Sequence, residues 1–372
     1  MALVLNEDQK LLAETAKSFA AKGAPVSRLR KLREDALGFD PELWKRMAEL
    51  GWTGLPFPEA DGGLGLGLAD VVCLTEELGR TLMTEPYLST VLVAGQLLAS
   101  AGTEQQKAAH LAPLIAGESH VALAHAERTT RAALDGIETT VQSAGSDLLI
   151  SGEKRQVLGA TAAQTFIVVA RENDGLSMYL VPRNAPGVEV VRQWRIDAAP
   201  VAIVRLREVK LQRTSLLGSA GGARPLLENV LDRATVALAA EMLGGMSEAF
   251  ERTLAYLKER VQFGVAIGSF QALKHRAARL FIEIELTRSA VMAAARALDA
   301  GAEDAPALVS VAKARASDAF LLVANEAIQM HGGVGMTDEH EIGFFLKRAR
   351  GSELTFGDAA HHRGRFANLN GF

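Results

Sequence analysis

The feature that most constrains the fold of this chain is a change of hydrophobic periodicity that occurs twice along its 372 residues. Residues 5–120 and 222–331 place apolar side chains at helical spacing in segments rich in alanine and leucine, which lose little rotamer freedom in a helix. Between about 120 and 215, short apolar or β-branched runs alternate with Gly, Asp, Asn and Pro, as is typical of antiparallel strands with tight turns. These predicted strands lie at 148–150, 165–170, 178–181, 188–191 and 203–206. No helical segment separates these runs, so we expect no doubly wound parallel sheet. The sequence predicts a mainly α fold with a central antiparallel β-domain.

The same two transitions predict the domain boundaries. We expect an N-terminal helical domain at 1–119, a β-domain at 120–215 and a C-terminal helical domain at 216–372. Asn6 is the expected N-cap of the first helix, and Asp40-Pro41 the expected start of another. Further helices are expected at 71–80, 88–101 and 103–115. Three long helices are expected in the C-terminal domain, at roughly 222–259, 269–300 and 303–331.

Composition and missing motifs exclude several classes of function. The net charge of −4 argues against a nucleic-acid partner, and the single cysteine, Cys73, excludes an internal disulfide or a CxxC site. No apolar run is long enough to span a bilayer, and the acidic, polar start does not resemble a secretory signal, so we expect a cytoplasmic protein. HExxH, GxGxxG, GxxxxGK[ST] and GxSxG motifs are missing, and the pair His361-His362 does not by itself suggest a metal site.

The first segment whose side chains could bind a ligand runs from Arg260 to Gln271. It ends one predicted helix and begins the next. Arg260 offers a planar fork suited to a diphosphate, and the amides of Gln262 and Gln271 can hydrogen-bond ribose or phosphate. Phe263 supplies a flat face for a ring system. The alternative is a plain helix corner whose arginine complements the helix dipole.

The second segment runs from Gln329 to Thr337 and follows the last long helix. Three glycines in four positions, Gly332 to Gly335, allow a backbone to approach a cofactor closely. The alternative is an ordinary glycine cap at the helix end. His331, just before the glycines, could equally be a structural histidine.

Together, the two segments resemble the RxxFG…FQ and Q-x-x-GG-x-G elements that bind FAD in acyl-CoA dehydrogenases, and the resemblance extends to the helix–β–helix order of the whole chain. It implies FAD contacts from both segments: Arg260, Gln262, Phe263, Ile267, Gln271, Gln329, Gly332 and Gly333. It also implies the family's chemistry, in which a carboxylate removes an α-proton from an acyl-CoA thioester while the β-hydrogen leaves as hydride to the flavin. The expected partners are an acyl-CoA substrate, an electron-transfer flavoprotein and homologous subunits of a homo- or hetero-tetramer.

The catalytic base of the family is not found at either of its usual positions. The stretch that matches the family's Tyr-Glu-Gly-Thr reads Phe356-Gly357-Asp358-Ala359, and the other usual position is Ala234. Glu241 is the favoured candidate, because a lone carboxylate in an apolar helix stretch should have a raised pKa. The alternative is a carboxylate at a subunit interface or paired with an arginine. Asp358 is the second candidate, with helix capping as its alternative role.

The β-domain also departs from the family pattern near the flavin. Residues 126–128 read Ala-Glu-Arg in place of Thr-Glu-Pro, and residues 156–158 read Gln-Val-Leu in place of Trp-Ile-Thr. With this loss and with the ending Leu-Thr-Phe-Gly-Asp-Ala-x-His-His at 354–362, the chain most resembles the small subunits of two-component acyl-CoA dehydrogenases, such as pimeloyl-CoA dehydrogenase. The leading hypothesis is an FAD-dependent acyl-CoA dehydrogenase with Glu241 as base. The alternatives are a non-catalytic partner subunit that completes the FAD site of a catalytic homologue, and a flavin oxidase or monooxygenase on the same fold.

Overall fold

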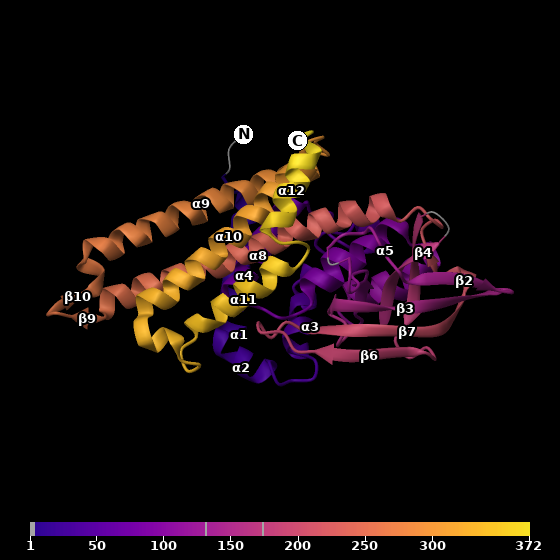
Figure 1. Cartoon of the computed structure of the whole chain (residues 1–372), viewed down its shortest axis with the longest axis horizontal. Coiled ribbons are helices and arrows are strands. Elements are labelled where there is room, and N and C mark those ends of the chain that lie inside the picture. The colour runs from indigo at the N-terminus through magenta and orange to yellow at the C-terminus, as the bar shows by residue number, and fades with distance from the viewer. Residues whose placement is uncertain (1–3, 131, 173–174) are drawn as a thin grey trace. The chain divides into compact units, whose positions relative to one another are not determined.

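A computed structural model describes residues 4–130, 132–172 and 175–372, and it confirms the predicted order of helices, sheet and helices (Figure 1). The helices before the sheet are α1 (Glu7–Gly23), α2 (Leu29–Leu32), α3 (Pro41–Glu49), α4 (Leu68–Arg80), α5 (Gln96–Ala101), α6 (Glu104–Gln106) and α7 (Ala112–Ile115). The helices after it are α8 (Arg224–Glu259), α9 (Gln271–Asp299), α10 (Ala305–His331), α11 (Ile342–Leu354) and α12 (Ala359–Leu369).

The predicted helix starts are formed by side-chain caps. The Asn6 side chain accepts a hydrogen bond from the backbone N–H of Gln9 at 2.8 Å, and Asp40 accepts from Glu42 N at 3.0 Å. The segment 88–101, predicted as one helix, instead begins as a π-helix over Tyr87–Gly95 and continues as α5. Apolar spacing predicts helix but does not distinguish the two hydrogen-bond patterns.

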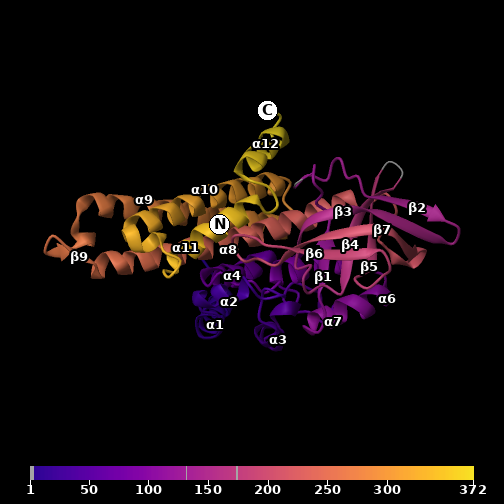
Figure 2. The same ribbon diagram turned by 60° about the horizontal axis from the view of Figure 1, so that its bottom comes forward.

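The sheet has the strand order β6-β7-β3-β2-β4-β5-β8, with β1 paired in parallel to β4 and most other pairs antiparallel (Figure 2). Its strands are β1 (Val121–Ala124), β2 (Thr140–Ala144), β3 (Asp147–Leu158), β4 (Thr165–Glu172), β5 (Gly175–Pro182), β6 (Val188–Gln193), β7 (Val201–Gln212) and β8 (Leu216–Leu217). The antiparallel character of the β-domain is confirmed. β1 and β2 were not predicted, and β3 is much longer than its predicted part, 148–150.

One of two register shifts between β3 and β7 explains why the length of β3 was underestimated. The pairing of β3 with β7 shifts between Ile150 and Gly152 and again between Lys154 and Val157. The first shift places its extra residue in β7, so β3 keeps its alternation and buries Leu148, Ile150 and Lys154. The second shift places its extra residue in β3, and the next buried residue is Val157, so the strand shows no continuous two-residue period. Gln156 lies in the second bulge with a positive φ of 52°.

Internal contacts divide the chain into two compact units that do not follow the order of the sequence. One unit comprises Met1–Arg30, Gly67–Met83 and Thr235–Phe372, and the other comprises Lys31–Leu66 and Thr84–Ala234. The sheet belongs to the second unit, whereas α1, α4, α9, α10, α11 and α12 belong to the first. The predicted boundaries at 119/120 and 215/216 follow the sequence instead and stay a prediction.

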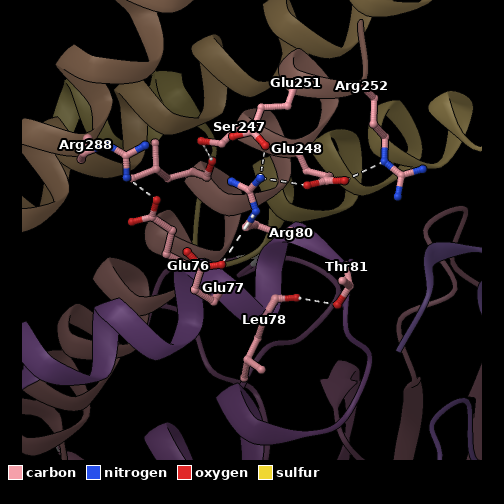
Figure 3. Close-up of polar contacts among 11 residues, drawn as sticks. Glu76, Glu77, Leu78, Arg80, Thr81, Ser247, Glu248, Glu251, Arg252 and Arg288 are labelled. Atoms are coloured by element: carbon pink, nitrogen blue, oxygen red, sulfur yellow. Dashed lines mark hydrogen bonds and ion pairs between the residues drawn. The ribbon is translucent and has the colours of Figure 1, made fainter. Parts of the chain in front are cut away.

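In the first unit, α4 and α8 pack with their backbones in close approach. A β-carbon at Gly244 would lie 1.7 Å from the carbonyl oxygen of Glu76, so a side chain there would force the helices apart. Arg80 on α4 crosses this contact and forms ion pairs with Glu248, at 3.0 Å, and Glu251 on α8 (Figure 3).

Candidate functional site: an exposed hairpin and a glycine turn

The segment from Arg260 to Gln271 forms a two-stranded hairpin between α8 and α9. Strands β9 (Val261–Gln262) and β10 (Val265–Ala266) pair antiparallel across Phe263 and Gly264, whose φ angles are 53° and 80°. Positive φ at both central residues is what a two-residue hairpin turn requires. Figure 1 shows this hairpin at the end of the long α9 helix.

The side chains of this hairpin project into solvent. Phe263 is 92% exposed, and Arg260, Gln262 and Gln271 are exposed as well, whereas Ile267 is partly buried. Gln262 donates a hydrogen bond to its neighbour's carbonyl oxygen at 2.8 Å. Within the described ranges, the guanidinium of Arg260 has no side-chain hydrogen bond or ion pair. Polar groups that could hold a phosphate are therefore available to a group that approaches from outside.

Apolar side chains surround these polar groups on the hairpin and continue onto α9. The exposed apolar residues are Val261, Val265, Phe270, Phe281, Ile282 and Leu286, with exposed fractions from 37% to 56%. An exposed apolar surface of this kind, next to a guanidinium without a side-chain partner in the described residues, is characteristic of an interface with another chain.

The second motif forms a turn after α10. Gly332 has a φ of 65°, and a 3₁₀ turn covers Gly332–Met336. A β-carbon at Gly332 or Gly333 would meet nothing within 4 Å, so this backbone is open to a ligand. Gln329, one turn earlier, is exposed.

His331 connects the two motifs and has a structural role. Its Nδ1 lies 2.7 Å from the carbonyl oxygen of Ala327, and its ring stacks on Tyr256 at 4.4 Å. Tyr256 lies one turn before Arg260 on α8, so the stack fixes the glycine turn to the helix that carries the hairpin. The structural interpretation of His331 is thus supported.

Glu241 is not alone in apolar surroundings. Arg348 Nη1 on α11 donates to Glu241 Oε1 at 2.7 Å, and the same guanidinium donates to the carbonyl oxygens of Leu82 and Met83. The arginine side chain is only 5% exposed and that of Glu241 is 22% exposed. The premise of an isolated carboxylate fails, and the arginine-paired alternative describes the observed geometry. A role for Glu241 as catalytic base stays a prediction.

Asp358 caps α12. Its Oδ1 accepts a hydrogen bond from the backbone N–H of His361 at 2.8 Å, and this bond holds the pKa of Asp358 below its usual value. A lowered pKa makes a carboxylate a weaker base, so the capping alternative is favoured.

In the β-domain, Glu127, which lies between the departures from the family pattern at residues 126 and 128, forms a buried ion pair with Lys154. Lys154 Nζ donates to Glu127 Oε1 at 2.6 Å, and the hydroxyl of Thr139 donates to the same oxygen at 2.6 Å. Burial lowers the pKa of Lys154 to about 8, although Glu127 acts to raise it. The Glu127–Lys154 pair was not predicted, and the alternative that pairs Glu241 with an arginine did not identify Arg348, because ion pairs between distant segments leave no periodic signal in a sequence.

Three family models match consecutive parts of the chain: the N-terminal domain of acyl-CoA dehydrogenase at residues 6–118, the middle domain at 122–209 and the C-terminal domain at 220–368. Acyl-CoA dehydrogenase IpdE2 of Mycobacterium tuberculosis is 34% identical over 93% of this chain and 92% of its own length. The chain belongs to the acyl-CoA dehydrogenase family. Probable acyl-CoA dehydrogenase YngJ of Bacillus subtilis is 31% identical over 96% of this chain and 97% of its own. A solved structure of a variant of the Tcur3481-Tcur3483 steroid ACAD is 31% identical, with a TM-score of 0.88 and 98% of both chains covered.

Acyl-CoA dehydrogenases are flavin-dependent oxidoreductases that use FAD, and this chain is one of them. The exposed side chains fit such a cofactor chemically. One guanidinium and three amides can hydrogen-bond phosphate and ribose oxygens, and two open glycines permit close backbone approach. Among the described residues, no cluster of three or more His, Cys, Asp or Glu could hold a metal ion. Over the same ranges, no helix is both long and apolar enough to cross a membrane.

Proposed function

We propose that this chain is one subunit of an oligomeric acyl-CoA dehydrogenase that introduces an α,β double bond into an acyl-CoA thioester. In this proposal the hairpin and the glycine turn bind the adenine and phosphate end of an FAD whose flavin end lies in a homologous neighbouring subunit. When bound, that cofactor supplies the hydride acceptor. The observation that carries the proposal is the outward projection of Arg260, Gln262 and Phe263 beside an exposed apolar surface.

We further propose that the base belongs to the neighbouring subunit. Glu241 is held by a buried arginine, Asp358 is held by a backbone N–H, and position 357 is glycine. A carboxylate whose lone pairs are already bonded to a cation is a poorer proton acceptor than a free one. The name of the Tcur3481-Tcur3483 relative joins two components, which supports a two-component arrangement for this chain.

The second candidate is a chain that is catalytic by itself with Glu241 as base. The side chain of Glu241 is 22% exposed and thus not closed off from small molecules, which favours this candidate. For both candidates we propose an electron-transfer flavoprotein as acceptor and a cytoplasmic location. Because the Tcur3481-Tcur3483 relative is named a steroid ACAD, thioesters with ring-bearing acyl groups belong among the substrates to be tested beside straight and dicarboxylic chains.

The test begins with the ratio of FAD to chain after expression alone and after co-expression with a homologous larger subunit. The proposal predicts little FAD alone and about one FAD per pair of chains in the complex. Arg260→Gln should lower this ratio, whereas Arg207→Gln, a change of a 75% exposed arginine in the β-domain, should not. A full complement of FAD in the chain alone would contradict the shared site.

Turnover with an artificial electron acceptor then distinguishes the two candidates. If the base is in the partner, Glu241→Gln leaves turnover of the complex unchanged within a few-fold. If Glu241 is the base, the same variant loses several orders of magnitude of kcat while it still binds FAD. Fast peroxide production with oxygen alone would instead indicate a flavin oxidase.

A further inference from the structure

Two apolar side chains of the second unit project into solvent. Trp194 is 65% exposed and Ile196 is 66% exposed, more than any other large apolar residue in the described part of that unit. Both lie in the loop that follows β6, the strand at one edge of the sheet (Figure 1). None of the contacts assigned above to FAD involves this loop. Since exposed apolar side chains that lie together mark an interaction surface, the loop needs an explanation of its own.

The loop is held in place by its own charged side chains. Arg195 donates two hydrogen bonds to the carboxylate of Asp197, at 2.9 Å from Nε and 2.8 Å from Nη2, and the Asp197 side chain is only 1% exposed. The guanidinium of Arg192 lies 4.0 Å from the centre of the Trp194 ring and covers one of its faces. The indole is therefore ordered on one face and open to solvent on the other. An apolar side chain that is ordered before binding loses less entropy when a partner covers it.

Strand pairing places the start of this loop beside a stretch of β3 that departs from the family pattern near the flavin. Gln193, the last residue of β6, pairs with Val201 on β7, and Val201 pairs with Leu158 on β3. The side chain of Gln193 also accepts a hydrogen bond from the backbone N–H of Gln156 at 3.2 Å. Gln156 and Leu158 are the first and last residues of the altered stretch. Trp194 therefore leaves the sheet next to the part of the β-domain that faces the flavin in the family pattern.

The neighbouring subunit of the proposed function supplies a surface that can cover this loop. In that proposal the hairpin of this chain meets an FAD whose flavin end lies in a homologous neighbour. Two chains of one fold that pair in this way are related by an approximate two-fold axis, so each contact occurs a second time with the roles exchanged. The neighbour's hairpin then lies against the β-domain of this chain, where no flavin end is proposed.

A homologous hairpin fits an aromatic anchor chemically. In the hairpin of this chain, Val261, Phe263 and Val265 are 56%, 92% and 44% exposed. A hairpin of the same kind offers the open face of Trp194 an apolar surface with an aromatic ring at its tip. Aromatic rings pack on one another more favourably than their buried area alone accounts for. The same hairpin that contacts a cofactor at one face can therefore contact an indole at the other.

We propose that Trp194 and Ile196 anchor the hairpin of the homologous neighbouring subunit. The inference rests on the proposed function and extends it, because it gives a role to the β-domain face on which no flavin end is proposed. The two chains then meet at two non-equivalent places. At one place the FAD lies between hairpin and β-domain, and at the other Trp194 packs directly on the hairpin.

The test follows the three tryptophans of the chain by ¹⁹F NMR. The chain is labelled with 5-fluorotryptophan and mixed with an unlabelled homologous larger subunit, and the Trp194 resonance is assigned from its loss in Trp194→Phe. Trp44 and Trp52 are each 2% exposed, so a soluble paramagnetic agent should broaden only the Trp194 resonance in the chain alone. In the complex, all three resonances should be protected from broadening.

Two variants test the energetic role of the loop. Trp194→Ala should weaken association with the larger subunit roughly ten-fold or more, as expected of an aromatic anchor, and Ile196→Ala should weaken it several-fold. Leu50→Ala, a change of a 46% exposed leucine elsewhere in the second unit, should leave the affinity unchanged. Alanine at the aromatic tip of the partner's hairpin, combined with Trp194→Ala, should weaken association by less than the product of the two separate effects. Fully independent effects would overturn the hairpin as the group that covers Trp194.

The FAD content separates this inference from the proposed function. When association is saturated, the Trp194→Ala complex should still hold about one FAD per pair of chains, because the flavin lies at the other contact. A Trp194 resonance that stays accessible in a complex with one FAD per pair would overturn this inference alone. FAD that binds to every chain and by itself protects Trp194 would assign this face to a flavin and overturn both proposals. The protection measurement uses the unsubstituted chain, so it decides the question even if Trp194→Ala does not fold.

Discussion

The imidazole of His361 occupies the space that a side chain at Gly357 would need. A β-carbon at residue 357 would lie 2.5 Å from His361 Cδ2 and 3.2 Å from Nε2, and the backbone there has a φ of 102°. Residue 357 matches the position at which many acyl-CoA dehydrogenases carry their glutamate. In this chain residue 357 is therefore a glycine without a carboxylate, and the imidazole of His361 fills the space that a side chain there would need.

We predict that Gly357→Glu does not restore a base and destabilises the chain. Gly357→Ala alone should lower the free energy of unfolding by about 1–3 kcal/mol, because a side chain at this φ is strained and contacts His361. The Gly357→Ala/His361→Ala double variant should recover part of this loss, since only the steric part is relieved. Urea unfolding of the parent, the two single variants and the double variant measures the loss of stability and its partial recovery. A Gly357→Glu variant as stable as the parent, with new turnover, would contradict this interpretation.

The ion pair between Glu241 on α8 and Arg348 on α11 predicts that substitutions at the two positions have coupled effects on the free energy of unfolding. Arg348→Met leaves Glu241 and two carbonyl oxygens without their donor, so we expect a loss of about 3 kcal/mol. Glu241→Gln keeps a hydrogen-bond acceptor and should cost less. A double-mutant cycle by chemical unfolding should give a coupling energy of about 1 kcal/mol or more. Strict additivity would show that the pair contributes nothing to stability.

Glu77, beside Arg80 in the α4–α8 contact of Figure 3, should destabilise the folded chain at neutral pH. Burial raises the pKa of Glu77 to about 6, although Arg80 acts to lower it. A folded-state pKa above the unfolded value means that the carboxylate reduces stability above pH 6, and that this penalty disappears as the pH falls toward 4.5. Glu77→Gln should therefore raise the free energy of unfolding at pH 7 by about 1 kcal/mol and have little effect at pH 4.5. A stabilisation that is the same at both pH values would contradict the titration of Glu77 as its cause.

Local signals explain which parts of the fold could be predicted. The caps at Asn6 and Asp40 and the glycine turns each depend on a few adjacent residues, so the sequence reveals them directly. The course of β3 depends on a bulge that breaks its two-residue period, and the role of Arg348 depends on residues more than 100 positions away. The FAD contacts were inferred from motifs, whereas the exposed surface at Trp194 and Ile196 lies in a loop that has no motif.

Three histidines with lowered pKa values predict loss of stability in mild acid. Burial lowers the pKa of His120 and of His125 to about 4 and that of His362 to about 3. Each remains neutral in the folded chain while its unfolded form binds a proton below about pH 6.5, so stability falls as the pH drops from 6.5 toward 4. His362→Gln should reduce the slope of the free energy of unfolding against pH over this interval. Replacement of the exposed His275 by glutamine should not.

The buried lysine Lys313 predicts that the stability of the chain changes with pH in the alkaline range. Its side chain is fully buried, and its Nζ donates to the carbonyl oxygens of Glu353 at 2.9 Å and Gly357 at 2.8 Å. These hydrogen bonds hold in place the connection between α11 and α12. The connection includes Gly357, the residue that matches the family's glutamate position. Burial lowers the pKa of Lys313 to about 7, although Glu353 and Asp358 act to raise it.

A lysine whose folded pKa lies below its unfolded value of 10.5 reduces stability at and below pH 7, and this penalty is relieved as the pH rises toward 10.5. Lys313→Met removes the titration and leaves two buried carbonyl oxygens without a donor, which costs about 1–3 kcal/mol for each unsatisfied group. The parent should therefore gain stability relative to Lys313→Met between pH 7 and pH 10 in urea unfolding. Replacement of Lys210, an exposed lysine on β7 whose pKa is raised by its bond to Asp147, should give a difference that does not rise over this range. A parent-minus-variant difference for Lys313 that stays constant or falls with pH would show that this lysine is not the group that titrates.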